Sequence, residues 1–183
     1  MAGWRLSTLA GCSLAIGRYP TFRYDATGGG GYGTGSKQEP ARLCFVPATL
    51  SIPPLNSRTV RILGVPMPPG LTIRIEPVRL DGEFCAASGA LTLHLQAHFH
   101  FRAAGLLRPS PLWVDVLLST AVPAEQPVHP RWGLLAGKPL NSQGQGELVG
   151  AAAVPATGEG WLDRFLGLPD QALARLRVRL EPS

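Results

Sequence analysis

The chain has few charged residues, few cysteines and no long apolar run. Asp, Glu, Lys and Arg together make up 16% of its 183 residues, whereas about 25% is usual for a globular domain. Disordered chains combine low hydrophobicity with high charge, so a hydrophobic content of 45% argues against disorder. No apolar run approaches the roughly 20 residues of a transmembrane helix. We therefore expect a single folded domain over residues 1–183 without a transmembrane segment.

The three cysteines lie far apart, at positions 12, 44 and 85. They lack the paired spacing of a zinc site or a disulfide framework, which predicts buried free thiols in a reducing compartment.

The segment before Cys12 has the form of a bacterial lipobox, because Leu9, Ala10 and Gly11 precede the cysteine. Only Arg5 supplies positive charge there, and the apolar segment is about half the usual 7–15 residues of an export signal. A strand is therefore favoured over a lipoprotein at Cys12. Without a convincing export signal we expect a cytoplasmic protein, with a membrane-peripheral position as the alternative.

The basic residues exceed the acidic ones without forming a block. A net charge of +5 permits attraction to anionic surfaces. Nucleic acid is disfavoured as a partner, since the basic residues are not interleaved with aromatic residues on which bases could stack.

The strongest structural signal is the alternation of residues between Leu91 and Arg102. Its apolar members are Leu91, Leu93, Leu95, Ala97, Phe99 and Phe101, and its polar members are Thr92, His94, Gln96, His98, His100 and Arg102. Six successive matches to a period of two predict a strand with one apolar and one polar face.

The segment before this strand predicts its hairpin partner. Residues 71–76 alternate with Leu71 on the apolar face, and the phase flips after Pro77, which indicates a β-bulge. With a turn around Ser88 and Gly89, this register places three pairs across the hairpin: Asp81 with His94, Glu76 with His98, and Arg74 with His100.

Glycine (22) and proline (18) separate the remaining apolar runs. Further strands are predicted over residues 4–16, 22–24, 43–52, 59–63, 112–119, 147–154 and 175–180. A glycine-rich loop, TGGGGYGTGS, is predicted at 27–36 and a proline-rich loop at 121–145. The glycine run fits a flexible hairpin loop better than a nucleotide site, because no helix follows it to hold a phosphate.

One short helix is expected near the C-terminus, where Trp161, Leu162, Phe165 and Leu166 form an apolar stripe. Gly167 is placed to end it and Pro169 to prevent its continuation. Residues 170–174 are expected to add a single helical turn. The fold class is therefore mostly β: an antiparallel β-sandwich or barrel with one short helix in the C-terminal region.

Two short segments echo each other, Leu-Gly-Val-Pro at 63–66 and Leu-Gly-Leu-Pro at 166–169. Together with Phe165 and the phrase Met-Pro-Pro-Gly-Leu at 67–71, they make the chain resemble uncharacterised β-rich proteins of cyanobacteria. The resemblance covers these segments, leads to no named family, and implies a β-rich fold without an activity.

His98 and His100 form a His-x-His pair on one face of their strand, about 7 Å apart along the backbone. With Glu76 across the hairpin they are the candidate metal ligands. A catalytic metal needs three good ligands and an open position, and the neighbouring Arg74 would repel a cation. A solvated polar face is therefore favoured over a metal site.

Arg175, Arg177 and Arg179 share one face of the last predicted strand, at intervals of about 7 Å. They are candidates for contact with phosphates, lipid head groups or an acidic protein patch. The favoured alternative is an edge strand that charge protects against aggregation.

Neither a catalytic residue nor a cofactor can be named from the chain, which has no nucleophile motif such as G-x-S-x-G. The leading hypothesis is a soluble, non-enzymatic binding module for an apolar or amphipathic small ligand or for a partner protein. The alternatives are an assembly factor that docks onto an anionic surface through the three arginines, and a metal-dependent enzyme that uses the His-x-His strand.

Overall fold

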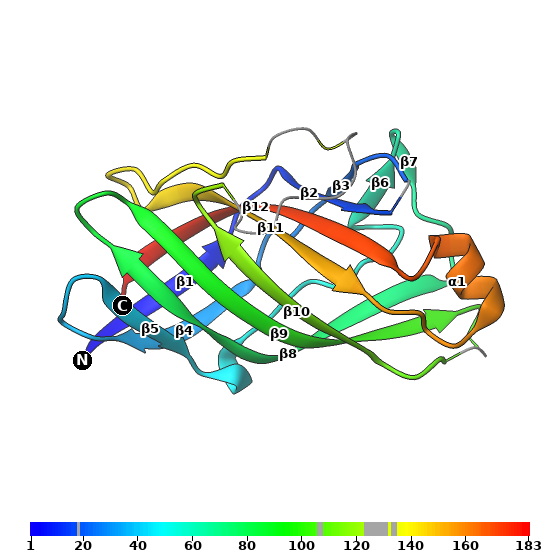
Figure 1. Ribbon diagram of the computed structural model, residues 1–183, viewed down its shortest axis with the longest axis horizontal. Coiled ribbons are helices and arrows are strands. Elements are labelled where there is room, and N and C mark those ends of the chain that lie inside the picture. Colours follow the sequence, from blue (N-terminus) through cyan, green and yellow to red (C-terminus); the bar gives the residue numbers. More distant parts are fainter. Residues whose placement is uncertain (18, 106–107, 123–131, 133–134) are drawn as a thin grey trace.

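Twelve strands and one short helix make up the computed structural model, which describes residues 1–17, 19–105, 108–122, 132 and 135–183 (Figure 1). The strands are β1 (Ala2–Thr8), β2 (Cys12–Ile16), β3 (Phe22–Tyr24), β4 (Gly30–Gly35), β5 (Ala41–Phe45), β6 (Val60–Ile62), β7 (Val65–Pro66), β8 (Leu71–Cys85), β9 (Ala90–Ala103), β10 (Leu112–Ser119), β11 (Gln145–Val154) and β12 (Asp170–Pro182). A 3₁₀ turn covers Pro47–Thr49, and the helix α1 covers Gly160–Leu166.

The strands form one antiparallel sheet that closes on itself. Its order is β1-β4-β5-β8-β9-β10-β11-β12, and β1 pairs again with β12 to complete a ring. In the other half of the molecule β12 pairs with β2, the sheet continues through β3, β6 and β7, and Leu55 bridges to Ile73 of β8. The predicted mostly β, antiparallel fold with one short helix is confirmed, and the pairing of β1 with β12 closes part of the sheet into a ring.

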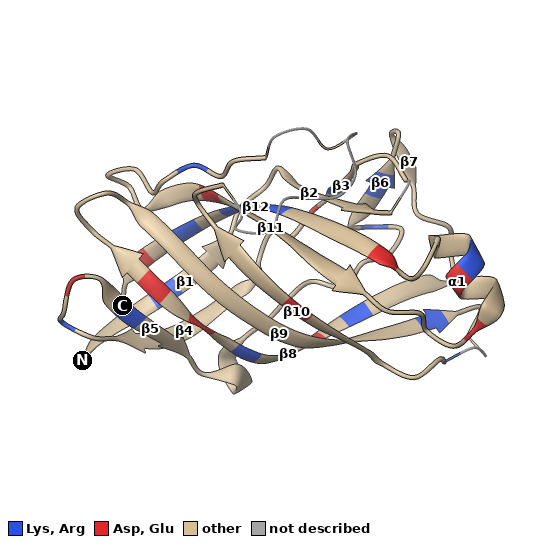
Figure 2. Ribbon diagram, viewed as in Figure 1, with Lys and Arg blue, Asp and Glu red and all other residues tan. Residues whose placement is uncertain are grey.

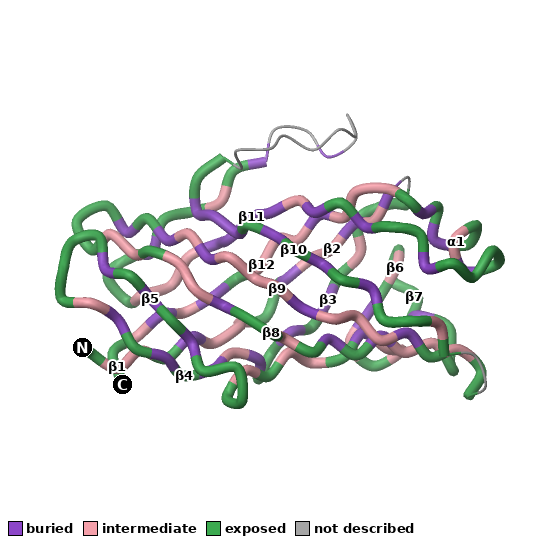
Figure 3. Tube along the Cα trace, turned by 60° about the horizontal axis from the view of Figure 1, so that its bottom comes forward, coloured by how far each residue is buried: buried purple, intermediate pink, exposed green. Residues whose placement is uncertain are grey.

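The apolar faces of the long strands point into the ring. On β9 the alternation is as predicted, with Leu91, Leu93 and Ala97 at most 1% exposed. Figure 3 shows buried and exposed residues alternating along the strands. The two larger core clusters lie one near α1 and one near the chain termini, and Leu95, Phe99 and Leu176 pack against both. A third, smaller cluster contains Ala15, Val149 and Leu173.

The β8–β9 hairpin has the predicted register. A shift between Pro77 and Arg79 marks the bulge. The aligned pairs are Arg74 with His100, Glu76 with His98, and Asp81 with His94.

The prediction of a loop at 27–36 is wrong, because Gly30–Gly35 is strand β4, which pairs with β1 and β5. The glycines allow these strands to approach closely. A Cβ at Gly33 would lie 2.5 Å from the carbonyl oxygen of Cys44. Glycine therefore allows close strand packing here. Its low strand propensity is the reason that the sequence predicted a loop instead of a strand.

Three boundaries also differ from the predictions. The predicted first strand is interrupted at residues 9–11, and the strand expected to reach Ile52 ends at Phe45 before the 3₁₀ turn. Residues 170–174 begin β12 and form no helical turn. The helix itself is confirmed, and Gly167 ends it in the left-handed conformation with φ of 70°.

Most of the predicted proline-rich loop lies outside the described residues, at 123–131 and 133–134. In its described part, Lys138 forms a bridge with Glu147, and Trp132 and Leu135 pack in an apolar cluster with Val149.

The prediction of buried thiols holds for one cysteine only. Cys12 is buried, Cys85 is half-buried and Cys44 is exposed. Burial raises the pKa of the Cys12 thiol. Among the residues described, no helix has the length and apolar character needed to cross a membrane.

Candidate functional site

The inside of the ring holds an apolar cavity of about 270 Å³. Strands from both halves of the molecule and the helix α1 contribute to its wall. Side chains that reach it include Leu14, Phe22, Ile73, Leu95, Phe99, Val114, Leu148, Ala152, Ala172, Ala174 and Leu176. No charged side chain is present among the described residues of the wall.

Small residues on β11 and β12 leave this space open. Gly150 and Ala152 of β11 and Ala172 and Ala174 of β12 all line the cavity. Strands β8 and β9, which β10 separates from β11 in the sheet, contribute larger side chains to the same wall, among them Ile73, Leu95 and Phe99. With small residues at the four positions on β11 and β12, part of the interior stays unfilled.

Three hydroxyl groups of the wall, on Thr8, Tyr19 and Tyr24, donate hydrogen bonds to backbone carbonyls. Thr8 Oγ1 donates to the Ala26 carbonyl, and the Tyr24 hydroxyl donates to the Pro53 carbonyl. Burial is the main cause of the raised pKa of Tyr24, so this phenol keeps its proton. A molecule in the cavity therefore meets an almost entirely apolar surface.

The α1 end of the ring contains side chains that reach from the cavity to solvent. Tyr19 and Phe165 line the cavity, yet they are 38% and 47% exposed. The Tyr19 hydroxyl donates to the Phe165 carbonyl, and the two rings lie 6.3 Å apart. Of the predicted helix stripe, Leu162 and Leu166 are buried whereas Trp161 is exposed. At the opposite end, the ring of Trp4 packs edge-on against that of Phe84. We take the Tyr19–Phe165 contact as the mouth of the cavity.

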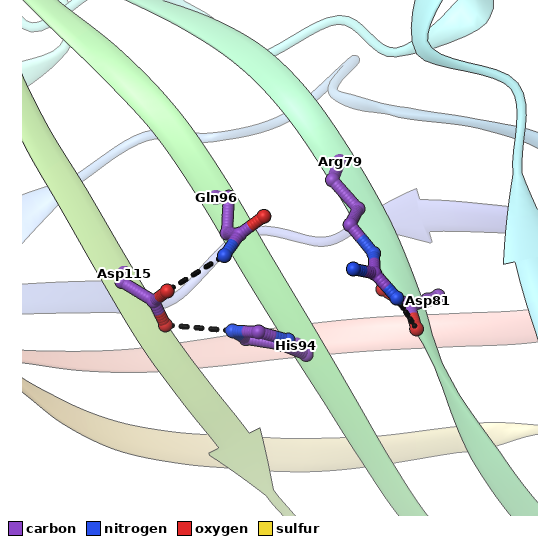
Figure 4. Close-up of polar contacts among 5 residues, drawn as sticks. All are labelled: Arg79, Asp81, His94, Gln96 and Asp115. Atoms are coloured by element: carbon purple, nitrogen blue, oxygen red, sulfur yellow. Dashed lines mark hydrogen bonds and ion pairs between the residues drawn. The ribbon is translucent and has the colours of Figure 1, made fainter.

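On the outside of the ring, polar side chains of β8, β9 and β10 form two separate groups (Figure 4). His94 Nε2 lies 2.6 Å from Asp115 Oδ1, and Gln96 donates to the other carboxylate oxygen at 2.7 Å. These two hydrogen bonds lower the pKa of Asp115. Asp81 instead accepts both hydrogen bonds of Arg79, at 2.6 and 2.9 Å.

The register is as predicted, but the histidines that form ion pairs do so with carboxylates other than the ones aligned with them. His94 pairs with Asp115 of β10 because the aligned Asp81 is held by Arg79 on its own strand. Glu76, which is aligned with His98, pairs diagonally with His100 at 2.8 Å.

The candidate metal ligands come together only in part. His100 and Glu76 are in contact, while the His98 ring packs edge-on against Trp113 with 5.0 Å between centroids. The described residues contain no group of three His, Cys, Asp or Glu side chains suited to a metal ion.

The three arginines of β12 lie on the outer face of the ring, because the alternating Ala174, Leu176 and Val178 line the cavity. Figure 2 shows basic and acidic positions spread over the strands without a single block of one sign. Arg175 Nη1 lies 2.8 Å from Glu147 Oε1, and Arg177 Nη1 donates to the Ala10 carbonyl at 3.3 Å. Arg179 is aligned with Gln145 on one side and Ser7 on the other. The edge-strand interpretation is wrong, because β12 pairs with β11 on one side and with β1 and β2 on the other.

No family model, curated protein or solved structure matches this chain. The resemblance to β-rich proteins of cyanobacteria therefore stays a prediction. Function has to be inferred from the residues of the cavity and of the outer surface.

Sequence reasoning did not identify the cavity residues as a site. The alternation on β9 predicts that Leu95 and Phe99 point inward, but not that space remains beside them. The small residues of β11 were the available signal. Small residues such as Gly150 and Ala152 on the inner face of a strand leave space beside them inside the ring. Whether larger side chains from other strands fill that space is seen only in the folded structure.

Proposed function

We propose that this protein binds one neutral, apolar small molecule inside the ring of strands and performs no chemistry on it. The cavity of about 270 Å³, with its uncharged wall, is the observation that supports this function. An apolar cavity of about 150 Å³ is large enough to hold benzene. The interior therefore suits a larger hydrocarbon, such as a terpenoid fragment or part of an acyl chain.

The apolar wall of the cavity disfavours ligands that carry a charge. Burying an ionised group without a partner costs many kcal/mol, and the described wall residues offer no counter-charge. The wall also offers few hydroxyl groups that could donate a hydrogen bond to a ligand, since those of Thr8 and Tyr24 already donate to backbone carbonyls. An amphipathic ligand would have to leave its polar end at the mouth, near Tyr19 and Phe165.

The same wall supports binding over catalysis. Among the described wall residues the titratable side chains are Tyr19 and Tyr24, and both phenols donate to backbone carbonyls. General acid–base catalysis needs a group whose pKa lies near the working pH and which reaches the substrate. A phenol with a raised pKa does not meet this requirement.

Two measurements test this function. Protein stripped of lipid is titrated with N-phenyl-1-naphthylamine, a neutral probe whose fluorescence rises in apolar surroundings, and we expect saturation at one probe per chain. Protein purified from its native source is extracted with organic solvent, and mass spectrometry should find one neutral apolar compound in near-stoichiometric amount. Failure of the probe to saturate, together with an empty extract, would refute the binding function.

A further inference from the structure

A line of polar residues crosses the outer face of the ring at β12, β2, β3 and β6. Arg175 is aligned with Ser13, Ser13 with Arg23, and Arg23 with Arg61. Aligned residues on neighbouring strands share a face of the sheet. The line points outward, because the neighbouring aligned pair of Tyr24 and Val60 is buried inside.

An open groove runs along this line. Its walls include Ala10, Gly11, Ser13, Arg23, Asp25, Arg58, Thr59 and Arg61. Arg177 reaches its rim, since Arg177 donates to the Ala10 carbonyl and its side chain lies against Gly11. Three arginines therefore line the groove: Arg23 from β3, Arg61 from β6, and Arg58 from the segment before β6. A fourth, Arg177 of β12, lies at its edge.

These four arginines have no carboxylate partner among the described residues. Elsewhere in the described residues, ion pairs neutralise Arg5, Arg42, Arg74, Arg79 and Arg175, whereas Arg102, Arg108, Arg164 and Arg179 are in no ion pair and none of these four lines the groove. Asp25, the one acid among the described residues of the groove, accepts a hydrogen bond from the backbone N–H of Thr27 at 3.0 Å. The pKa of Asp25 is lowered by Thr27, and no arginine contributes to that shift.

Two like charges directly opposite each other on neighbouring strands are destabilising. Arg23 and Arg61 are such a pair, and Arg58 adds a third charge in the same groove. A bound anion would remove this repulsion. Guanidinium groups match the oxygens of a phosphate with paired N–H donors, and the Ser13 hydroxyl lies between the strands that carry Arg23 and Arg175.

An apolar hairpin tip adjoins the groove. Leu63 and Val65, two and four residues after Arg61, are 80% and 64% exposed. Figure 1 shows the β6–β7 hairpin projecting from the ring at the end that carries α1. Exposed apolar side chains next to clustered arginines are typical of segments that bind anionic membranes.

We propose that this groove binds the phosphate of an anionic phospholipid head group, with Arg23, Arg58 and Arg61 as its ligands and the Leu63 tip inserted among the acyl chains. Arg177 adds positive charge at the rim. The site lies outside the ring and requires no ligand in the cavity.

The test measures co-sedimentation of the whole protein with phosphatidylcholine vesicles, with and without phosphatidylglycerol. The protein should bind the anionic vesicles and not the neutral ones, and added salt should weaken binding. The double variant Arg23→Gln/Arg61→Gln should lose at least about 10-fold in affinity for anionic vesicles. The matched control, Arg42→Gln/Arg102→Gln, removes the same net charge from β5 and β9 and should change affinity less than about threefold.

A second variant separates the lipid from free phosphate. Leu63 has φ of 50°, a conformation that Asn tolerates, so Leu63→Asn removes the apolar tip without straining the turn. It should weaken vesicle binding and leave the calorimetric binding of inorganic phosphate unchanged. Phosphate binding that depends on Arg23 and Arg61 without any vesicle binding would overturn the lipid as ligand. Equal loss in both double variants would overturn the groove as the site.

Probe binding in the cavity distinguishes failure of this site from failure of the fold or of the cavity function. All three variants should still saturate with N-phenyl-1-naphthylamine if the cavity binds that probe, and they should keep the β-sheet circular dichroism of the wild type.

Discussion

Ala152 and Ala153 are adjacent residues of β11 that face opposite sides of the ring. Ala152 lines the cavity and is 7% exposed, whereas Ala153 is exposed on the outside. The substitution Ala152→Phe places a benzyl group in the cavity, and Ala153→Phe adds the same group to the surface. The pair therefore tests whether the interior has room.

The expected magnitude follows from the volume. Empty apolar cavities cost about 24 cal/mol per Å³, and benzene occupies a cavity of about 150 Å³, so filling that part restores about 3–4 kcal/mol. Repacking of neighbouring side chains takes back about 2 kcal/mol, the middle of the usual range for added core volume. The free energy of unfolding of ligand-free Ala152→Phe should therefore rise by about 1–2 kcal/mol, which for a chain of this length is a Tm increase of about 2–8 °C.

The assay is urea unfolding of lipid-stripped protein, followed by titration with N-phenyl-1-naphthylamine. Ala152→Phe should lose probe binding, and Ala153→Phe should keep it with stability changed by about 0.5 kcal/mol or less. The reasoning is refuted if Ala152→Phe is destabilised by more than about 2 kcal/mol while it binds the probe as the wild type does. That result would mean that the interior near Ala152 is filled and that the probe binds elsewhere.

Three further predictions concern single hydrogen-bonding or gating groups. Tyr24→Phe leaves the half-buried Pro53 carbonyl without its donor and should lower the free energy of unfolding by about 0.5–1.5 kcal/mol; urea unfolding with no change would contradict that bond. Asp163 accepts hydrogen bonds from the backbone N–H and the hydroxyl of Thr157, both at 2.6 Å, and its pKa is lowered from 3.8 chiefly by Thr157. A carboxylate whose pKa is depressed in the folded protein stabilises the fold at pH values above its unfolded pKa, and this stabilisation is lost as the pH falls through its folded pKa. Asp163→Asn should therefore lower Tm at pH 7 and have little effect on Tm well below pH 3.8. A Tm difference between variant and wild type that persists in acid would argue against this role of the carboxylate. Phe165→Ala widens the mouth, so stopped-flow dissociation of the probe should become faster with little change in Kd, and an unchanged rate would place the entrance elsewhere.

Local pattern predicted the longest hairpin well. The alternation from Leu91 to Arg102 is set by which side chains face the interior, and a period of two shows this directly in the sequence. The bulge at Pro77 was predictable for the same reason, because proline removes a ladder donor and shifts the phase of the strand. The end of α1 at Gly167 was also a local signal.

Long-range pairing explains what the sequence could not predict. Gly30–Gly35 forms a strand only because β1 and β5 approach it on both sides. His94 pairs with Asp115 because β10 lies beside β9, a neighbour that the hairpin pattern does not reveal. The arginine groove depends on β6 lying beside β3, with Arg61 aligned with Arg23.

Crystallography under xenon pressure tests the central claim most directly, because xenon enters dry apolar cavities. We predict xenon inside the ring, in contact with Leu95, Phe99 and Leu176, which lie between the two core clusters. An interior without xenon, with these three side chains touching residues of the opposite wall, would contradict the existence of a ligand cavity.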